Sequence, residues 1–274
     1  MWMILFGGTE KFHKEVICSI RKIFVIGLEE VKNLKYLGLN VDQQDHGSIS
    51  VSLYDYIQCI QPVQLTSSHI FDKDKLLDEN DYSVYRRLIG QLNWCATQAR
   101  VDICFDNCVL GNASAKPKWC DMLNAVKTLR KVKSQDMGLK FSIPNCLSSS
   151  TINCYGDASY ANLPSGASQG AYIVFIVDPS GTANVISWQS RKLRRVCKDT
   201  LTAECLAAVE ALHAALFFKA VFDELIVKNN IKIRLLTDNK SLVQSVKSIT
   251  SVDDKLLRVD MVILKECQGY IFFN

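Results

Sequence analysis

Three acidic residues stand in three different local patterns, and their order along the chain constrains the fold more than any other feature. Asp157 follows a strand-like run that begins at Cys154. Glu204 lies in the first turns of a helix-like run, and Asp238 closes a second strand-like run that begins at Ile231. Apolar strands that end in a carboxylate bury the strand and expose the acid at the sheet edge. The pattern therefore predicts carboxylates that converge at one end of a sheet.

Carboxylates that converge from separate elements are typical of a site for two Mg²⁺ ions. Mg²⁺ prefers oxygen ligands, and two such ions can cleave a phosphodiester. Three packed carboxylates repel one another, so we expect at least one pKa to rise without metal. Simpler alternatives stay open: Asp157 and Asp238 could be turn residues after strands, and Glu204 could be an acid favoured by the dipole of a helix start.

Composition limits the class of protein. The 274 residues allow one large domain or two of ordinary size, and 48% apolar with 22% charged residues is typical of a globular protein. The eleven cysteines form no CxxC pair, and the four histidines are scattered, which excludes zinc spacing and favours reduced thiols. The apolar start lacks the basic region of a signal peptide, and no run approaches the length of a membrane span. We expect an intracellular protein, in cytoplasm or nucleus, with no membrane partner.

Basic residues are clustered although the net charge is only +4. Between Lys116 and Lys140, seven basic residues face only two aspartates. A second cluster follows the strand-like run that contains Trp188. Such clusters can meet phosphates, or they can be solvated faces of helices and loops. The second cluster comprises Arg191, Lys192, Arg194, Arg195 and Lys198.

The first half of the chain predicts strands and then helices. Residues 1–6 predict a strand, and an apolar residue at every fourth position between Phe12 and Phe24 predicts an amphipathic helix. Two paired strands are expected, over 34–41 and 48–53. A polar loop over 66–80 and a linker over 141–150 would flank a helical part. The helices expected there span 85–97, 101–111 and 117–133.

The second half predicts strand, hairpin, helix, strand and helix. The hairpin strands, 170–177 and 183–189, are joined by the strong turn sequence Asp178-Pro179-Ser180-Gly181. A long helix is expected over 201–222. Two further helices are expected over 239–249 and 255–266.

Several motifs together resemble the C-terminal part of a copia-type retrotransposon Pol polyprotein. The likeness covers nearly the whole chain and keeps the order of the family. The end of the family's reverse-transcriptase palm and thumb is similar to Phe6-Gly7-Gly8-Thr9 and to 35–38. The family's connection segment is similar to 85–92, 99–103 and the Trp119 helix. Its ribonuclease H region is similar to 155–161, 186–192 and 202–204.

The resemblance implies an α/β fold in three parts. Residues 1–65 would be a remnant of the reverse-transcriptase palm and thumb. A helical connection segment would follow over 66–145. Residues 151–274 would form a ribonuclease H-like mixed sheet with flanking helices, truncated at the C-terminus. Trp188 is expected in the core of this domain rather than as a stacking platform.

Two departures from the family pattern bear on activity. The two polymerase aspartates of the family have Trp2 and Met3 in their place, so we expect no DNA synthesis. The chain also ends before the fourth aspartate of the family's ribonuclease H site. Without that aspartate, we expect one of the metal ions to bind more weakly. Asp260 could replace that ligand, but an acid on a helix surface is the favoured interpretation.

The resemblance implies a ribonuclease H that cleaves the RNA strand of an RNA–DNA hybrid by two-metal hydrolysis. Asp157 would bridge two Mg²⁺ or Mn²⁺ ions, and Glu204 and Asp238 would each bind one. The alternatives are a catalytically dead relic that at most binds nucleic acid, or a structural subunit for other Pol chains. The residues expected to contact the hybrid are Ser159, Arg191, Lys192, Arg194, Arg195 and Asn239.

Overall fold

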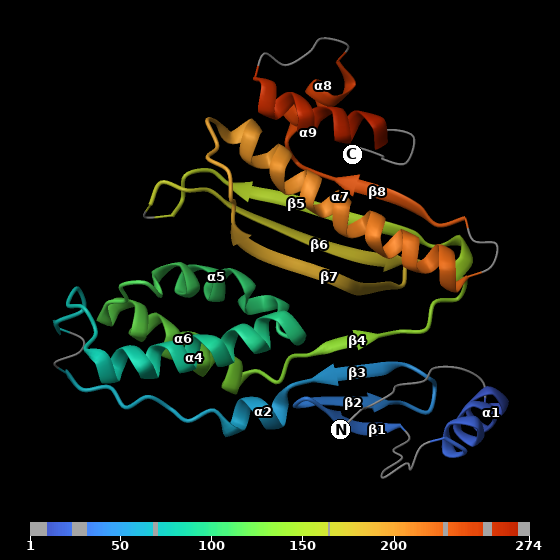
Figure 1. The fold of residues 1–274 in the computed structure, drawn as a ribbon, viewed down its shortest axis with the longest axis horizontal. Coiled ribbons are helices and arrows are strands. Elements are labelled where there is room, and N and C mark those ends of the chain that lie inside the picture. The colour runs from blue at the N-terminus through green and yellow to red at the C-terminus, as the bar shows by residue number, and fades with distance from the viewer. Residues whose placement is uncertain are drawn as a thin grey trace.

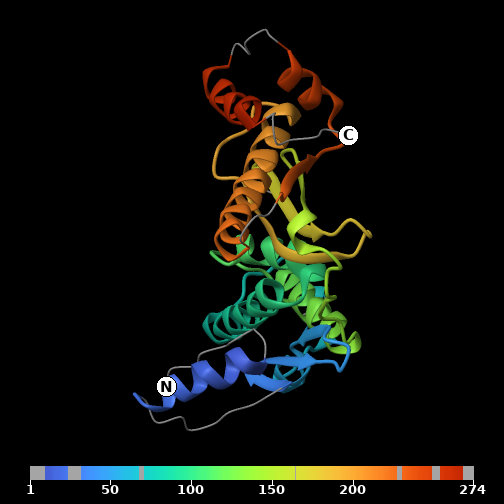
Figure 2. The same ribbon diagram turned by 90° about the vertical axis from the view of Figure 1, so that its right-hand side faces the viewer.

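The chain forms two four-stranded sheets with a group of helices between them in the computed structural model (Figure 1). Figure 2 shows these parts arranged one after another along the molecule. The predicted strand over 1–6 lies outside the described residues. The structure describes residues 10–23, 32–67, 71–163, 165–226, 230–248 and 254–267.

The first sheet is antiparallel with the order β1-β2-β3-β4. The predicted helix near the start is α1 (Glu10–Arg21). The run 34–41, expected as one strand, is two strands, because the chain turns back at Leu37 and Gly38, which both have positive φ. Gly38 adopts this conformation without the steric cost of a side chain. The strands are β1 (Asn33–Tyr36), β2 (Leu39–Gln43), β3 (Ile49–Ser52) and β4 (Leu139–Phe141).

The helices of the middle part share one hydrophobic core with the first sheet. Leu53, Tyr85, Leu92 and Met122 are fully buried in it. The predicted helices are present, but α4 begins earlier than expected because the Asp78 side chain accepts a hydrogen bond from the Asp81 amide. The helices are α2 (Tyr54–Cys59), α4 (Glu79–Gln98), the 3₁₀ turn η1 (Val101–Ile103), α5 (Cys104–Ala113) and α6 (Trp119–Ser134).

The segment 141–150, predicted as a linker, is fixed at both ends. β4 overlaps its start and pairs with β3. A short 3₁₀ turn, η2 (Leu147–Ser149), lies near its end. The Asn145 amide donates to the Asp178 carboxylate at 2.8 Å, which ties the segment to the turn of the next hairpin.

The second sheet is mixed, as expected, with the order β7-β6-β5-β8. β5 is parallel to β8 and antiparallel to β6, and β6 is antiparallel to β7. α7 lies across one face, and α8 and α9 lie beside α7 (Figure 1). The strands are β5 (Thr151–Ser159), β6 (Gln169–Val177), β7 (Ala183–Lys192) and β8 (Lys232–Leu236); the helices are α7 (Thr200–Leu225), α8 (Lys240–Lys247) and α9 (Lys255–Glu266).

Close packing of β5 on α7 depends on a glycine. Ile152 and Cys154 alternate with outward-facing residues and are fully buried against the helix. At the next inward position, Gly156, a Cβ atom would lie 2.7 Å from the carbonyl oxygen of Ala207. Only a residue without a side chain allows this approach.

The expectation that no segment reaches the length of a membrane span is wrong for α7. In the described part of the chain, this one helix is long and apolar enough, by length and composition alone. Its residues Cys205, Ala208, Leu212 and Ala215 are fully buried in the core with the sheet. The core helix of a globular domain has the same length and composition, so the property is weak evidence for a membrane.

Trp188 joins the two halves of the molecule, in contrast to the core position that the sequence predicted. It lies half-buried on β7, and its indole N–H donates to the carbonyl oxygen of Ala96 on α4 at 2.8 Å. Asn184, also on β7, makes two hydrogen bonds to the backbone of Ser142, at 2.7 and 2.8 Å. These contacts fix β7 against α4 and against the segment that follows β4.

We expect Gly156→Ala to lower the free energy of unfolding by about 1–3 kcal/mol, because the new methyl group would push α7 away from β5. Urea denaturation of the purified chain measures this. Gly90→Ala is the matched control, since nothing lies within 4 Å of a Cβ there. It should be neutral or stabilise α4 by about 0.5–1 kcal/mol. Equal stability of the two variants would contradict the packing argument.

Candidate active site

The structure brings the three predicted acids together at one edge of the second sheet. β5 and β8 are parallel, so their carboxyl ends meet at the same edge. Asp157 lies near the end of β5, and Asp238 follows the end of β8. Glu204 reaches them from α7. One oxygen from each carboxylate can be chosen so that all three lie within 4.8 Å of one another.

Helix starts on both sides hold the acids in place. The Asp199 side chain accepts from the amide and the hydroxyl of Thr202, both at 2.7 Å, and so begins α7 shortly before Glu204. The Asn239 side chain accepts from the Leu242 amide at 2.9 Å and begins α8 directly after Asp238. Both caps use residue types that favour a helix start.

The acids differ in exposure, and this difference sets their electrostatics. Asp157 and Asp238 are exposed, whereas Glu204 is only 6% exposed. Burial, followed by the charges of Asp157 and Asp238, raises the pKa of Glu204 to about 7, against a hydrogen bond with the Ala158 backbone that lowers it. The expected rise of at least one pKa is confirmed.

The donor set fits a divalent metal ion. Glu204 Oε2 is buried and has no hydrogen-bond partner among the described residues. A buried carboxylate oxygen without a partner is costly unless a cation or a proton meets it. Together with the two exposed aspartates it offers oxygen ligands of the type that Mg²⁺ and Mn²⁺ prefer.

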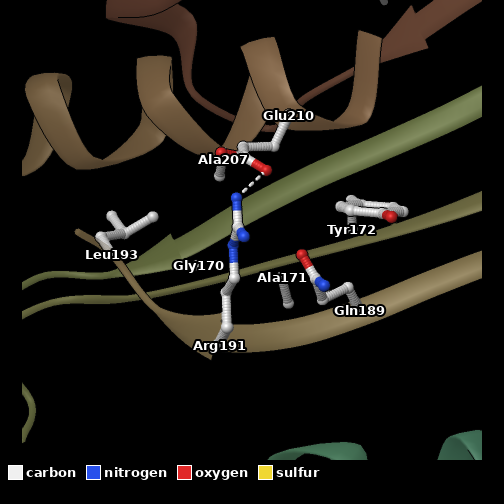
Figure 3. Close-up of a pocket in the computed structure, with 8 residues that line it drawn as sticks. All are labelled: Gly170, Ala171, Tyr172, Gln189, Arg191, Leu193, Ala207 and Glu210. Carbon is white, nitrogen blue, oxygen red and sulfur yellow. Dashed lines mark hydrogen bonds and ion pairs between the residues drawn. The ribbon is translucent and has the colours of Figure 1, made fainter. Parts of the chain in front are cut away.

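The basic cluster at the end of β7 and directly after it is mostly paired with acids. Arg191 points to Glu210 on α7 and forms an ion pair with it, within a small pocket between the sheet and the helix (Figure 3). Arg195 pairs with Asp260, and Lys198 with Asp254. Within the described ranges, the exposed residues Lys192 and Arg194 make no ion pair.

The other two predicted contacts with nucleic acid differ from each other. Ser159 is exposed, two residues beyond Asp157 on β5. Asn239 is half-buried, and its side-chain oxygen is already engaged by the Leu242 amide. The cap is therefore a structural use of Asn239 that the sequence alone did not reveal.

Asp260 is neither an exposed acid nor a member of the cluster formed by Asp157, Glu204 and Asp238. It is only 7% exposed on α9 and pairs with Arg195. The interpretation as a helix-surface acid is wrong, because α9 turns this position toward α7. The sequence also missed the roles of Glu210 and Asp254 as partners of the basic cluster. The only signal for these ion pairs in the sequence is that distant segments carry charges of opposite sign.

We expect the free energy of unfolding to fall as the pH rises from about 5 to about 8 in a chelating buffer. Glu204 holds its proton up to a pKa of about 7 in the folded chain, against 4.5 as the ordinary value, so the folded state binds more protons between these values. Glu204→Gln should remove on the order of 2 kcal/mol of this fall.

Urea denaturation at the two pH values measures the effect. Glu224→Gln is the control, because Glu224 is exposed on the same helix and lies far along α7 from the acids. A profile of Glu204→Gln that matches the unaltered chain would contradict the assignment of the raised pKa.

Comparison with known proteins gives one relative in sequence and several in structure. The chain is 28% identical over 194 residues to a transposon Ty5-1 protein of Saccharomyces cerevisiae, and the match covers 65% of this chain and 60% of that protein. The chain therefore spans less than two thirds of this relative. No protein-family model matches.

Among solved structures, the foamy viral protease-reverse transcriptase in complex with an RNA/DNA hybrid matches 98% of this chain and 33% of its own, with 12% identity and a TM-score of 0.56. Ribonuclease H1 from Halobacterium salinarum NRC-1 matches 45% of this chain and 85% of its own, with 20% identity and a TM-score of 0.34. The viral match shows a shared fold over nearly the whole chain. The resemblance to a retrotransposon polyprotein is confirmed: the chain is homologous to a retrotransposon protein and carries a ribonuclease H-like mixed sheet with flanking helices.

Proposed function

We propose that the part of the chain from β5 onward is a ribonuclease H that cleaves the RNA strand of an RNA–DNA hybrid. The observation that carries this proposal is the meeting of Asp157, Glu204 and Asp238 at the carboxyl ends of two parallel strands. The transposon relative and the viral fold match support it, since the viral structure holds an RNA/DNA hybrid. Three predictions stay untested. They are the placement in cytoplasm or nucleus, the division of the chain into parts at residue 65 and at 145–151, and an association with other Pol chains.

Asp157, Glu204 and Asp238 would hold Mg²⁺ or Mn²⁺. When bound, the ions supply a hydroxide at neutral pH and stabilise the leaving 3′ oxygen. The exposed aspartates can reach ions that are still partly hydrated. The buried Glu204 is fixed by its surroundings, so its oxygen presents a ligand with little freedom to lose.

Glu204 also couples metal binding to protons. Near neutral pH without metal, a large share of Glu204 is protonated, because its pKa is raised to about 7. A divalent ion needs the carboxylate form, so binding releases that proton. Metal affinity should therefore rise steeply with pH between about 6 and 8.

The exposed Ser159, Lys192 and Arg194 would contact the backbone of the hybrid. Lys192 lies opposite Gln169 on β6, which in turn lies opposite Ser159 on β5, so Ser159 and Lys192 share one row across the sheet. Contacts of this kind position a hybrid by its backbone and 2′-hydroxyl groups, without reading sequence. Arg191 and Arg195 contribute less, since each is already paired with an acid.

The first test of this function is cleavage of a labelled RNA–DNA hybrid in Mg²⁺ or Mn²⁺. We expect the purified chain to cut the RNA strand and Asp157→Asn to lose activity by about a hundredfold or more, because a metal ligand is gone. Asp157 is exposed, so the variant should keep its fold, which far-UV circular dichroism checks. A folded chain inactive in either metal would favour a relic that at most binds nucleic acid.

A second test concerns the basic residues. For Lys192→Ala and Arg194→Ala we expect weaker binding of the hybrid and a salt dependence that is shallower by about 0.9 for each lost phosphate contact. Arg191→Gln is the matched comparison, and it should change the slope less because Glu210 already neutralises Arg191. Fluorescence anisotropy from low to moderate salt measures the slopes. Equal slopes in all three variants would place the hybrid elsewhere.

A further inference from the structure

The segment between β7 and α7, residues 193–199, is held from two sides by polar contacts. Arg195 forms an ion pair with Asp260 on α9, and Lys198 Nζ lies 2.7 Å from Asp254 Oδ2 at the start of α9. On the other side, the Tyr160 hydroxyl donates to the carbonyl oxygen of Lys198 at 2.8 Å. The segment is thus tied both to α9 and to the residue that follows β5.

The Arg195–Asp260 pair is the stronger of the two ties to α9. The Asp260 side chain is 10% exposed and that of Arg195 is 39% exposed, whereas the Lys198 side chain is 76% exposed. Ion pairs at exposed positions contribute little, and a nearly buried acid needs its partner much more. The pair therefore fixes the segment at Arg195.

Both ties lie close to the start of α7. Asp199 caps that helix directly after Lys198, and Glu204 follows in its first turns. α9, which carries Asp260, packs against α7. In Figure 1, α9 lies beside the part of α7 that is nearest to this start.

The ties also connect the start of the helix that carries Glu204 to a helix that follows Asp238 in the chain. α7 carries Glu204, while α8 and α9 follow Asp238 in the chain. Each pair joins the segment before α7 to α9 or to the residue directly before it. A displacement of the α7 start would therefore have to break these contacts before it could separate Glu204 from Asp238.

We propose that the Arg195–Asp260 and Lys198–Asp254 ion pairs are positioning contacts that hold the start of α7, and with it Glu204, against Asp157 and Asp238. Arg195, whose sequence context predicted a contact with nucleic acid, then acts through α7 and does not touch the substrate. The catalytic consequence rests on the proposed ribonuclease function, but the positioning itself does not.

The test uses the full chain with Arg195→Met together with Asp260→Leu. This double variant removes both charges and leaves no buried acid without a partner, so the fold should persist. Lys219→Met is the matched control, because Lys219 and Asp223 form an ion pair on the same helix, with Nζ and Oδ2 2.9 Å apart, far from Glu204. The single variant Arg195→Met is measured beside them.

Three measurements are compared: hydrogen exchange of the amides at 200–206, Mn²⁺ affinity by calorimetry without substrate, and kcat and KM on the hybrid. In the double variant we expect exchange about tenfold faster and Mn²⁺ binding about tenfold weaker, since opening of the helix start becomes easier. The value of kcat should fall while KM changes little. Lys219→Met should match the unaltered chain in all three.

Unchanged exchange and Mn²⁺ affinity in the double variant, with a raised KM, would overturn the proposal and make Arg195 a contact with the hybrid. The proposal is also overturned if the single variant Arg195→Met changes only in KM. Faster exchange and weaker Mn²⁺ binding in a chain that never cleaves the hybrid would support the positioning role and refute the ribonuclease function. The two proposals can therefore fail separately.

Discussion

The parallel pairing of β5 with β8 is the constraint on which the rest of the second sheet and its helices depends. It brings Asp157 and Asp238, which are 81 residues apart in the printed sequence, to one sheet edge. A parallel pair requires a long crossover, and here the crossover contains the hairpin and α7. α7 covers the sheet and delivers Glu204 to the same edge. One pairing thus determines both the core and the meeting of the acids.

At Glu204, the position that would suit metal binding lowers the stability of the fold. A carboxylate that is nearly buried beside two others is unfavourable when ionised, and the chain tolerates it because it can hold a proton up to a pKa of about 7. The surrounding structure must therefore be stable enough to keep the residue in place. Fully buried Cys154, Leu212 and Leu235 in the core supply apolar burial, the largest favourable contribution in folding.

Local sequence patterns predicted the elements well but not their partners. Alternation and turn residues placed the β6–β7 hairpin, and the order of the acids predicted their convergence at Asp157, Glu204 and Asp238. The fold-back at Leu37 was missed because a run of alternating apolar residues hides a two-residue turn. The burial of Asp260 and the bond from Trp188 to Ala96 depend on packing between distant segments, which no local pattern contains.

The basic cluster shows most clearly why a charge pattern does not define a binding surface. Five basic residues between 191 and 198 suggested a cluster that can meet phosphates. Folding places an acid beside Arg191, Arg195 and Lys198, so these three charges are largely compensated before any ligand arrives. In the proposed function, the attraction of this cluster for a hybrid would rest on Lys192 and Arg194, together with metal ions held by the acids. Since each phosphate contact contributes separately to the salt dependence, a cluster with two uncompensated charges should by itself bind a hybrid weakly, and productive placement would depend on the metal.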